Sequence, residues 1–212
     1  MGFLINDRSI STGEKIQLGI SYLLQLSLLG AIVFAVYRKN WETSFLTLCI
    51  LFLTSLPSLF RRSYKVRLPI ELDFTVIVFI YAALFLGEVK GYYTIFWWWD
   101  VLLHTSSGIL FGIFGFLLVY VLNEEKKIRL NLKPFFVALF SFALANAVGA
   151  IWEIFEYSMD SFFGLNMQSS GLADTMWDLI VNLLGSLVVV TLGYLYLKSD
   201  RNFFRKIINK YL

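Results

Sequence analysis

The chain has 212 residues, of which 58% are hydrophobic, 18% are aromatic and only 16% are charged, and its formal net charge is +3. A soluble domain carries roughly 25% charged and about 45–50% apolar residues. The composition therefore excludes an ordinary soluble domain and predicts an all-α, polytopic bundle of transmembrane helices. Because about six spans of ~20 residues use most of the length, no second domain is expected. The small net charge gives no reason to expect a nucleic acid as a partner.

Long apolar runs separated by short polar loops predict where the chain crosses the membrane. Each run is interpreted as a helix, because a segment in lipid must satisfy its own backbone hydrogen bonds. The expected spans are residues 17–37, 44–60, 69–86, 100–122, 134–157 and 173–197. Together they form one membrane domain over residues 1–212, which ends in a basic cytoplasmic tail at 198–212.

Lysine and arginine are concentrated in alternate loops, which predicts the orientation of the chain. These residues follow the second, fourth and sixth spans, at Arg61, Arg62, Lys65, Arg67, Lys126, Lys127, Arg129, Lys133, Lys198, Arg201, Arg205, Lys206 and Lys210. The third loop contains only Lys90, and the fifth contains no lysine or arginine. The positive-inside rule then places both termini in the cytoplasm, although Arg38 and Lys39 after the first span weakly oppose it. The fourth and sixth spans therefore begin, and the fifth ends, at the outer face.

Acidic side chains recur at helical spacing at the outer end of the last three predicted spans. Asp100 and His104 are four residues apart, so they share one face of a helix. The same spacing of three or four residues relates Glu153, Glu156 and Asp160 in the fifth span, and Asp174, Asp178 and Asn182 in the sixth. Asn146 continues the stripe of the fifth span more deeply. Because short loops make these helices neighbours, we expect the three stripes to meet.

The charge balance at this end requires a positive partner. Six carboxyl groups stand beside one histidine, and the flanking outer loops add one lysine. A charge at mid-membrane costs roughly 2.5–3.5 kcal/mol on insertion scales, and like charges repel each other further. Protons or a metal ion would relieve this cost. Carboxylates with one imidazole suit a divalent metal such as Zn²⁺, Mn²⁺, Fe²⁺ or Mg²⁺.

Residue type and depth suggest a role for each member of the cluster. The candidate metal ligands are His104, Asp100, Asp178 and Asp174. Glu153 and Glu156 are candidate general bases. Asn146, Asn182 and Asp160 are candidates for orienting the ligands or contacting a substrate.

Simpler interpretations stay open for some of these residues. Asp174 stands where a carboxylate commonly caps a helix or interacts with its dipole. Asp160 also fits an ordinary loop. The glycines at 108, 112 and 115 predict close helix packing rather than a site.

Three segments, WWWDVLLHTSSGILFGIFGF, WEIFEYSMD and DTMWDLIVNLLG, resemble known families. They resemble the YjdF-like bacterial inner-membrane proteins, whose pattern is Asp-x3-His at a span start, Glu-x2-Glu in a later span and Asp-x3-Asp before an Asn/Gly step. More distantly, Asp100–His104 and Asp178–Asn182–Gly185 are similar to the VanZ-like family, which is associated with glycopeptide resistance. The resemblance covers about Trp97 to Val190. It implies a multi-pass protein of the bacterial cytoplasmic membrane and no particular activity.

Three functions are compatible with the acidic cluster. The favoured one is a metal-dependent hydrolase that acts on lipid or envelope-precursor head groups, with membrane lipid as its partner. The second is a proton- or cation-coupled transporter, although carrier sites usually lie near the midplane rather than at one end. The third is a non-catalytic structural or envelope-stress protein, in which a metal holds the bundle together.

Overall fold

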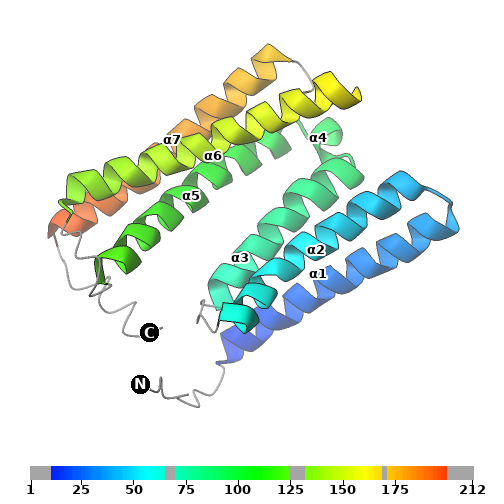
Figure 1. Ribbon diagram of the computed structural model, residues 1–212, viewed down its shortest axis with the longest axis horizontal. Helices are drawn as coiled ribbons and strands as arrows, with labels where there is room; N and C mark the ends of the chain where they lie inside the picture. Colours follow the sequence, from blue (N-terminus) through cyan, green and yellow to red (C-terminus); the bar gives the residue numbers. More distant parts are fainter. Residues whose placement is uncertain (1–10, 65–69, 125–131, 169–170, 200–212) are drawn as a thin grey trace. The chain divides into compact units, whose positions relative to one another are not determined.

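The computed structural model describes residues 11–64, 70–124, 132–168 and 171–199. Within these ranges the chain forms helices and no strand, which confirms the all-α prediction (Figure 1). The elements are α1 (Thr12–Tyr37), α2 (Trp41–Tyr64), α3 (Ile70–Ile80), the π-helix η1 (Tyr81–Val89), α4 (Tyr92–Ile95), α5 (Trp98–Glu124), α6 (Pro134–Phe163) and α7 (Leu172–Ser199).

Five of the described helical segments are long and apolar enough to cross a membrane, namely α1, α3 with η1, α5, α6 and α7. The helix α2 adds a shorter apolar stretch, Trp41–Pro57. The protein is therefore a multi-pass helical membrane protein. The orientation of its termini stays a prediction, and the basic residues within 65–69, 125–131 and 200–212, including most of the predicted tail, lie outside the described residues.

The chain divides into two compact units, which are described separately. Unit 1 contains α1 to α4 with η1, and unit 2 begins at Phe96 and contains α5, α6 and α7. The prediction of one domain over the whole length stays a prediction. All of the predicted site residues belong to unit 2.

Unit 1 packs α1 and α2 against α3 and η1. Its core contains Leu28 of α1, Ile50 of α2 and Phe85 of η1. The chain enters α1 through a capping box, in which the Ser11 hydroxyl accepts from the Glu14 backbone N–H and the Glu14 carboxylate accepts from the Ser11 N–H. This reciprocal pair satisfies backbone donors that the first turn of a helix leaves without partners.

The third predicted span is not uniform, because its second half is the π-helix η1. A π-helix has a wider backbone repeat than an α-helix and is rare over this length. Gly87 lies within η1, and a β-carbon there would lie 2.7 Å from the Tyr93 ring carbon Cζ. The missing side chain therefore allows the ring that follows to pack directly on the helix backbone.

Unit 2 is a three-helix bundle in which each helix contacts the other two. Pro134 begins α6 at a position where its missing N–H costs nothing, and Gly164 ends α6 with a left-handed φ of 67°. Because α6 runs opposite to α5 and α7 (Figure 1), α5 begins, α6 ends and α7 begins at one end of the bundle, which we call the site end.

Glycines set the spacing of α5 and α7. A β-carbon on Gly108 would lie 2.9 Å from the backbone nitrogen of Ser186, and still closer to the carbonyl oxygen of Asn182. On the facing helix, a β-carbon on Gly185 would collide with the carbonyl oxygen of Thr105. The two helices therefore touch backbone to backbone, as small residues permit within membranes.

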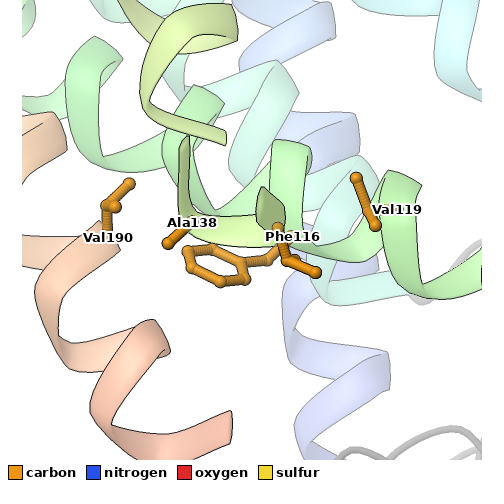
Figure 2. Close-up of a cluster of buried hydrophobic side chains, with 5 residues drawn as sticks. Phe116, Val119, Ala138 and Val190 are labelled. Atoms are coloured by element: carbon orange, nitrogen blue, oxygen red, sulfur yellow. The ribbon is translucent and has the colours of Figure 1, made fainter. Parts of the chain in front are cut away.

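A cluster of buried apolar side chains lies in the half of unit 2 away from the site end (Figure 2). All three helices contribute to this apolar plug, which consists of Phe116, Val119, Val137, Ala138 and Val190. Each of these side chains is at most 8% exposed. The bundle thus has a polar end and an apolar end.

Candidate metal centre

The centre of the site is the pair formed by Asp100 and His104 near the start of α5. One turn of helix separates them, and the His104 Nε2 atom lies 3.3 Å from the Asp100 Oδ1 atom. His104 is buried, whereas Asp100 is partly exposed. The pair therefore reaches from the surface of the bundle into its interior.

Asp178 brings a second carboxylate to this pair from α7. One ligand atom from each of Asp100, His104 and Asp178 can be chosen so that all three lie within 4.8 Å of one another. Asp178 is only 3% exposed. Its approach depends on the backbone contact at Gly108, which lies one turn below His104 on α5. Two oxygen donors and one nitrogen donor thus converge from two helices.

Glu153 of α6 approaches the opposite side of the histidine ring. Its Oε1 atom lies 3.7 Å from the His104 Nδ1 atom. The side chain is 4% exposed, and neither carboxylate oxygen has a partner at hydrogen-bonding geometry among the described residues. A buried carboxylate in this state is costly unless a positive group compensates it.

Asn182 lies one turn below Asp178 and fills the space that Gly149 leaves open. A β-carbon on Gly149 would lie 2.6 Å from the Asn182 Nδ2 atom. That nitrogen donates to the Ala145 carbonyl at 3.4 Å, whereas Oδ1 is buried without a donor among the described residues. Asn182 therefore bounds the cluster on the side that faces the interior of the bundle.

Asn146 lies deeper in the bundle, at the level of Ser186, which is one turn beyond Asn182. Its Nδ2 atom donates to the Phe142 carbonyl and to the Ser186 hydroxyl, at 2.8 and 3.0 Å. Ser186 is fully buried and continues the spacing of four from Asp178 through Asn182. The sequence-based prediction missed Ser186, although this spacing was a usable signal.

The remaining candidates at the site end have other surroundings. Glu156 is buried, and its Oε1 atom accepts from the Trp152 indole N–H at 2.8 Å. Asp160 accepts from the backbone N–H groups of Met167 and Gln168 at 2.7 and 2.9 Å, so it holds the turn between α6 and α7. The Gln168 amide in turn donates to the Thr175 hydroxyl.

Asp174 lies in the first turn of α7 and is partly exposed. It is not among the three residues whose ligand atoms converge. Its predicted role as a metal ligand stays a prediction, as does the role of each other candidate residue.

The fold and the site define a class: a multi-pass helical membrane protein with a carboxylate–histidine cluster buried at one end of a three-helix bundle. Residues 20–199 match the family described as "Predicted membrane protein (DUF2238)". The chain belongs to this family. The family match agrees with the resemblance to YjdF-like membrane proteins, whereas the VanZ-like resemblance stays a prediction.

A relative from Thermotoga maritima, described as "Uncharacterized protein", is 29% identical over 128 residues. The aligned segment covers 60% of this chain and 62% of the relative, so the chain spans about three fifths of that protein's length. No solved structure matches the chain.

Proposed function

We propose that unit 2 binds one divalent cation between Asp100, His104 and Asp178. The observation that carries this proposal is the convergence of their ligand atoms within 4.8 Å, from two helices, in a membrane-spanning bundle. Glu153 supports it independently, because a buried carboxylate whose two oxygens have no hydrogen-bond partner among the described residues points at the histidine ring. A cation at this place would compensate the buried negative charge.

The donor set favours a metal of intermediate hardness. Two carboxylates and a neutral imidazole balance the charge of a divalent ion, and the nitrogen donor favours Zn²⁺, Mn²⁺ or Fe²⁺ over Mg²⁺. Three protein ligands also leave a coordination position for water, as in catalytic zinc sites. The composition of the site is therefore compatible with chemistry as well as with a structural role.

The surroundings of the site end suggest where a substrate would come from. Trp97, Phe162, Phe163 and Trp177 are all exposed at this end. Exposed aromatic side chains collect at the level of lipid head groups. The distribution of lysine and arginine supports the proposal that this level is the outer face of a bacterial cytoplasmic membrane. We therefore propose a hydrolase for lipid or envelope-precursor head groups, in which the metal activates water and Glu156 is the candidate general base.

The apolar plug argues against the alternative of a transporter. A transported proton or ion needs polar groups along its path. Below Asn146 and Ser186, the three helices pack Phe116, Val137 and Val190 into a buried apolar cluster. The polar side chains of the cluster are therefore concentrated toward one end of unit 2.

Elemental analysis of the purified full-length protein tests the proposal. Protein supplied with Zn²⁺, Mn²⁺ and Fe²⁺ should retain about one metal ion per chain, and His104→Ala and Asp178→Asn should each lose it. Asp160→Asn is the matched control, because it removes a carboxylate at the same end that holds a turn instead. A wild-type protein that retains no metal, or variants that retain it fully, would contradict the proposal.

The hydrolase part is tested separately, on metal-loaded protein in vesicles of anionic phospholipid. Release of the head group should require the metal and should fall sharply in Glu156→Gln, while that variant keeps its metal. Metal binding without any release of head groups would favour the structural alternative.

A further inference from the structure

The two nitrogens of His104 face two different carboxylates on two different helices. Nε2 lies 3.3 Å from Asp100 on its own helix, and Nδ1 lies 3.7 Å from Glu153 on α6. The two nitrogens of an imidazole point in diverging directions, so one carboxylate cannot serve both. Asp178 completes the metal-binding group with Asp100, and Glu153 is not part of that group.

A metal-binding histidine usually donates the N–H of its other nitrogen to a carboxylate or a carbonyl group. This second contact fixes the ring orientation and decides which nitrogen keeps its proton. The geometry points to Glu153 as the positioning residue of His104: from 3.7 Å, a small approach on cation binding would let its carboxylate accept from Nδ1–H and thereby present Nε2 to the cation. This inference rests on the proposed function, and it assigns to Glu153 a role other than that of general base.

The contacts of Glu153 support a positioning role rather than contact with a substrate. Glu153 and Glu156 are both buried, at 4% and 8% exposed, so their different neighbours separate their roles. A general base must reach the water or the substrate group that it deprotonates. Glu153 reaches the ring of His104 instead, from the side away from Asp100.

Neighbouring residues enclose the Glu153 side chain. Gly149 lies one turn before it on α6, and the space beside this glycine is filled by Asn182. The Thr175 hydroxyl of α7 also lies close to the carboxylate, without reaching hydrogen-bonding geometry. The side chain is thus enclosed by α5, α6 and α7, and its contact with a basic side chain among the described residues is the one to the His104 ring, at 3.7 Å.

Nuclear magnetic resonance of the ring nitrogens tests this role directly. His104 is the protein's only histidine, so its ¹⁵N imidazole signals identify themselves in full-length, ¹⁵N-histidine-labelled protein. With Zn²⁺ added, we expect the metal on Nε2 and a retained, slowly exchanging proton on Nδ1. Glu153→Ala should shift the Nδ1 signal and speed its proton exchange, with or without Zn²⁺. Glu156→Gln, one turn further along α6, should leave both nitrogen signals in place.

Zinc affinity supplies the second measurement. Glu153→Ala should weaken Zn²⁺ binding by about 10–100-fold, the usual effect of losing such a supporting group. Glu153→Gln should restore part of this loss, because its amide carbonyl can still accept from Nδ1–H. Asp178→Ala should cost more than either variant, since it removes a ligand.

Several results would overturn the inference. If zinc binds Nδ1, Glu153 lies beside the metal and does not position the ring. The same conclusion follows if Glu153→Ala weakens Zn²⁺ binding as much as Asp178→Ala does. Unchanged nitrogen signals and unchanged affinity in Glu153→Ala would remove any role toward His104. If the wild-type protein binds no Zn²⁺ but Glu153→Ala still moves the Nδ1 signal, the contact stands and the proposed metal site alone fails.

Discussion

Gly108→Ala should separate α5 from α7 and weaken metal binding without removing any ligand. The added β-carbon would lie 2.9 Å from the Ser186 nitrogen and closer still to the Asn182 carbonyl oxygen, whereas ordinary contacts begin at 3.4 Å. These obstacles are backbone atoms, so a side-chain rotation cannot relieve the clash. The helices must therefore move apart locally.

The expected size of the effect follows from general packing energies applied to this contact. Overpacking of this kind costs about 1–3 kcal/mol, partly offset by the roughly 0.8–1.0 kcal/mol that alanine gains over glycine in a helix. His104 lies one turn before Gly108, and Asp178, another proposed ligand, lies across the same contact. Because metal–ligand distances tolerate only about ±0.2 Å, we expect Zn²⁺ affinity to fall by at least ~10-fold, or about 1.4 kcal/mol.

Gly30→Ala in α1 is the matched control, because no atom lies within 4 Å of the β-carbon it would add. Thermal unfolding in detergent and calorimetric titration with Zn²⁺ measure both effects. Gly30→Ala should keep or slightly raise the melting temperature and leave Zn²⁺ affinity unchanged. Equal melting temperatures and equal affinities in the two variants would refute the reasoning from helix contact to site geometry.

The remaining predictions concern stability and local order. Phe116→Ala should lower the free energy of unfolding by about 3 kcal/mol. This is the low end for a buried phenylalanine, because lipid is as apolar as the plug. Phe114 is exposed, so Phe114→Ala should change the melting temperature much less. Asp160→Ala should speed hydrogen exchange at the Met167 amide. An unchanged rate would show that the turn is stable without the Asp160 carboxylate. Ser11→Ala should destabilise the start of α1 by about 0.5–2 kcal/mol, seen as faster exchange in its first turn only.

Spacing and loop length were enough to predict the centre of the candidate site. Asp100 and His104 share a face because they are four residues apart, and the short connection between α6 and α7 brings Asp178 to the same end. These arguments need only the helical repeat and the order of the spans. The all-α fold followed from composition for a similar reason, since lipid leaves few other solutions.

The finer division of the cluster could not be predicted from spacing. Glu153 and Glu156 are three residues apart, so a helical repeat places them on nearly the same face. In the structure, the first lies against His104 and the second against the Trp152 indole. Which carboxylate meets the histidine depends on the rotation of α6 against its neighbours, and that rotation is set by contacts such as Asn182 against Gly149.

The π-helix and the turn after α6 were also beyond the sequence-based prediction. An apolar run predicts a helix, but it does not distinguish an α-helical from a π-helical backbone, as η1 shows. Asp160 had the spacing of a site residue. Its carboxylate instead accepts hydrogen bonds from two backbone N–H groups, and these depend on how the chain turns seven and eight residues later. Local geometry of this kind emerges only when the chain is folded.

The shallow position of the cluster determines how strongly the membrane potential would act on a bound ion. His104 is the seventh of the 27 residues of α5, so it lies about 9 Å along a helix of roughly 40 Å, at ~1.5 Å per residue. A divalent ion would thus cross at most about a quarter of the field, worth roughly 1 kcal/mol per 100 mV. With the site end at the outer face, as proposed, a negative interior would draw cations into the site. At ~100 mV the site would then bind the ion about fivefold more tightly than in a depolarised cell.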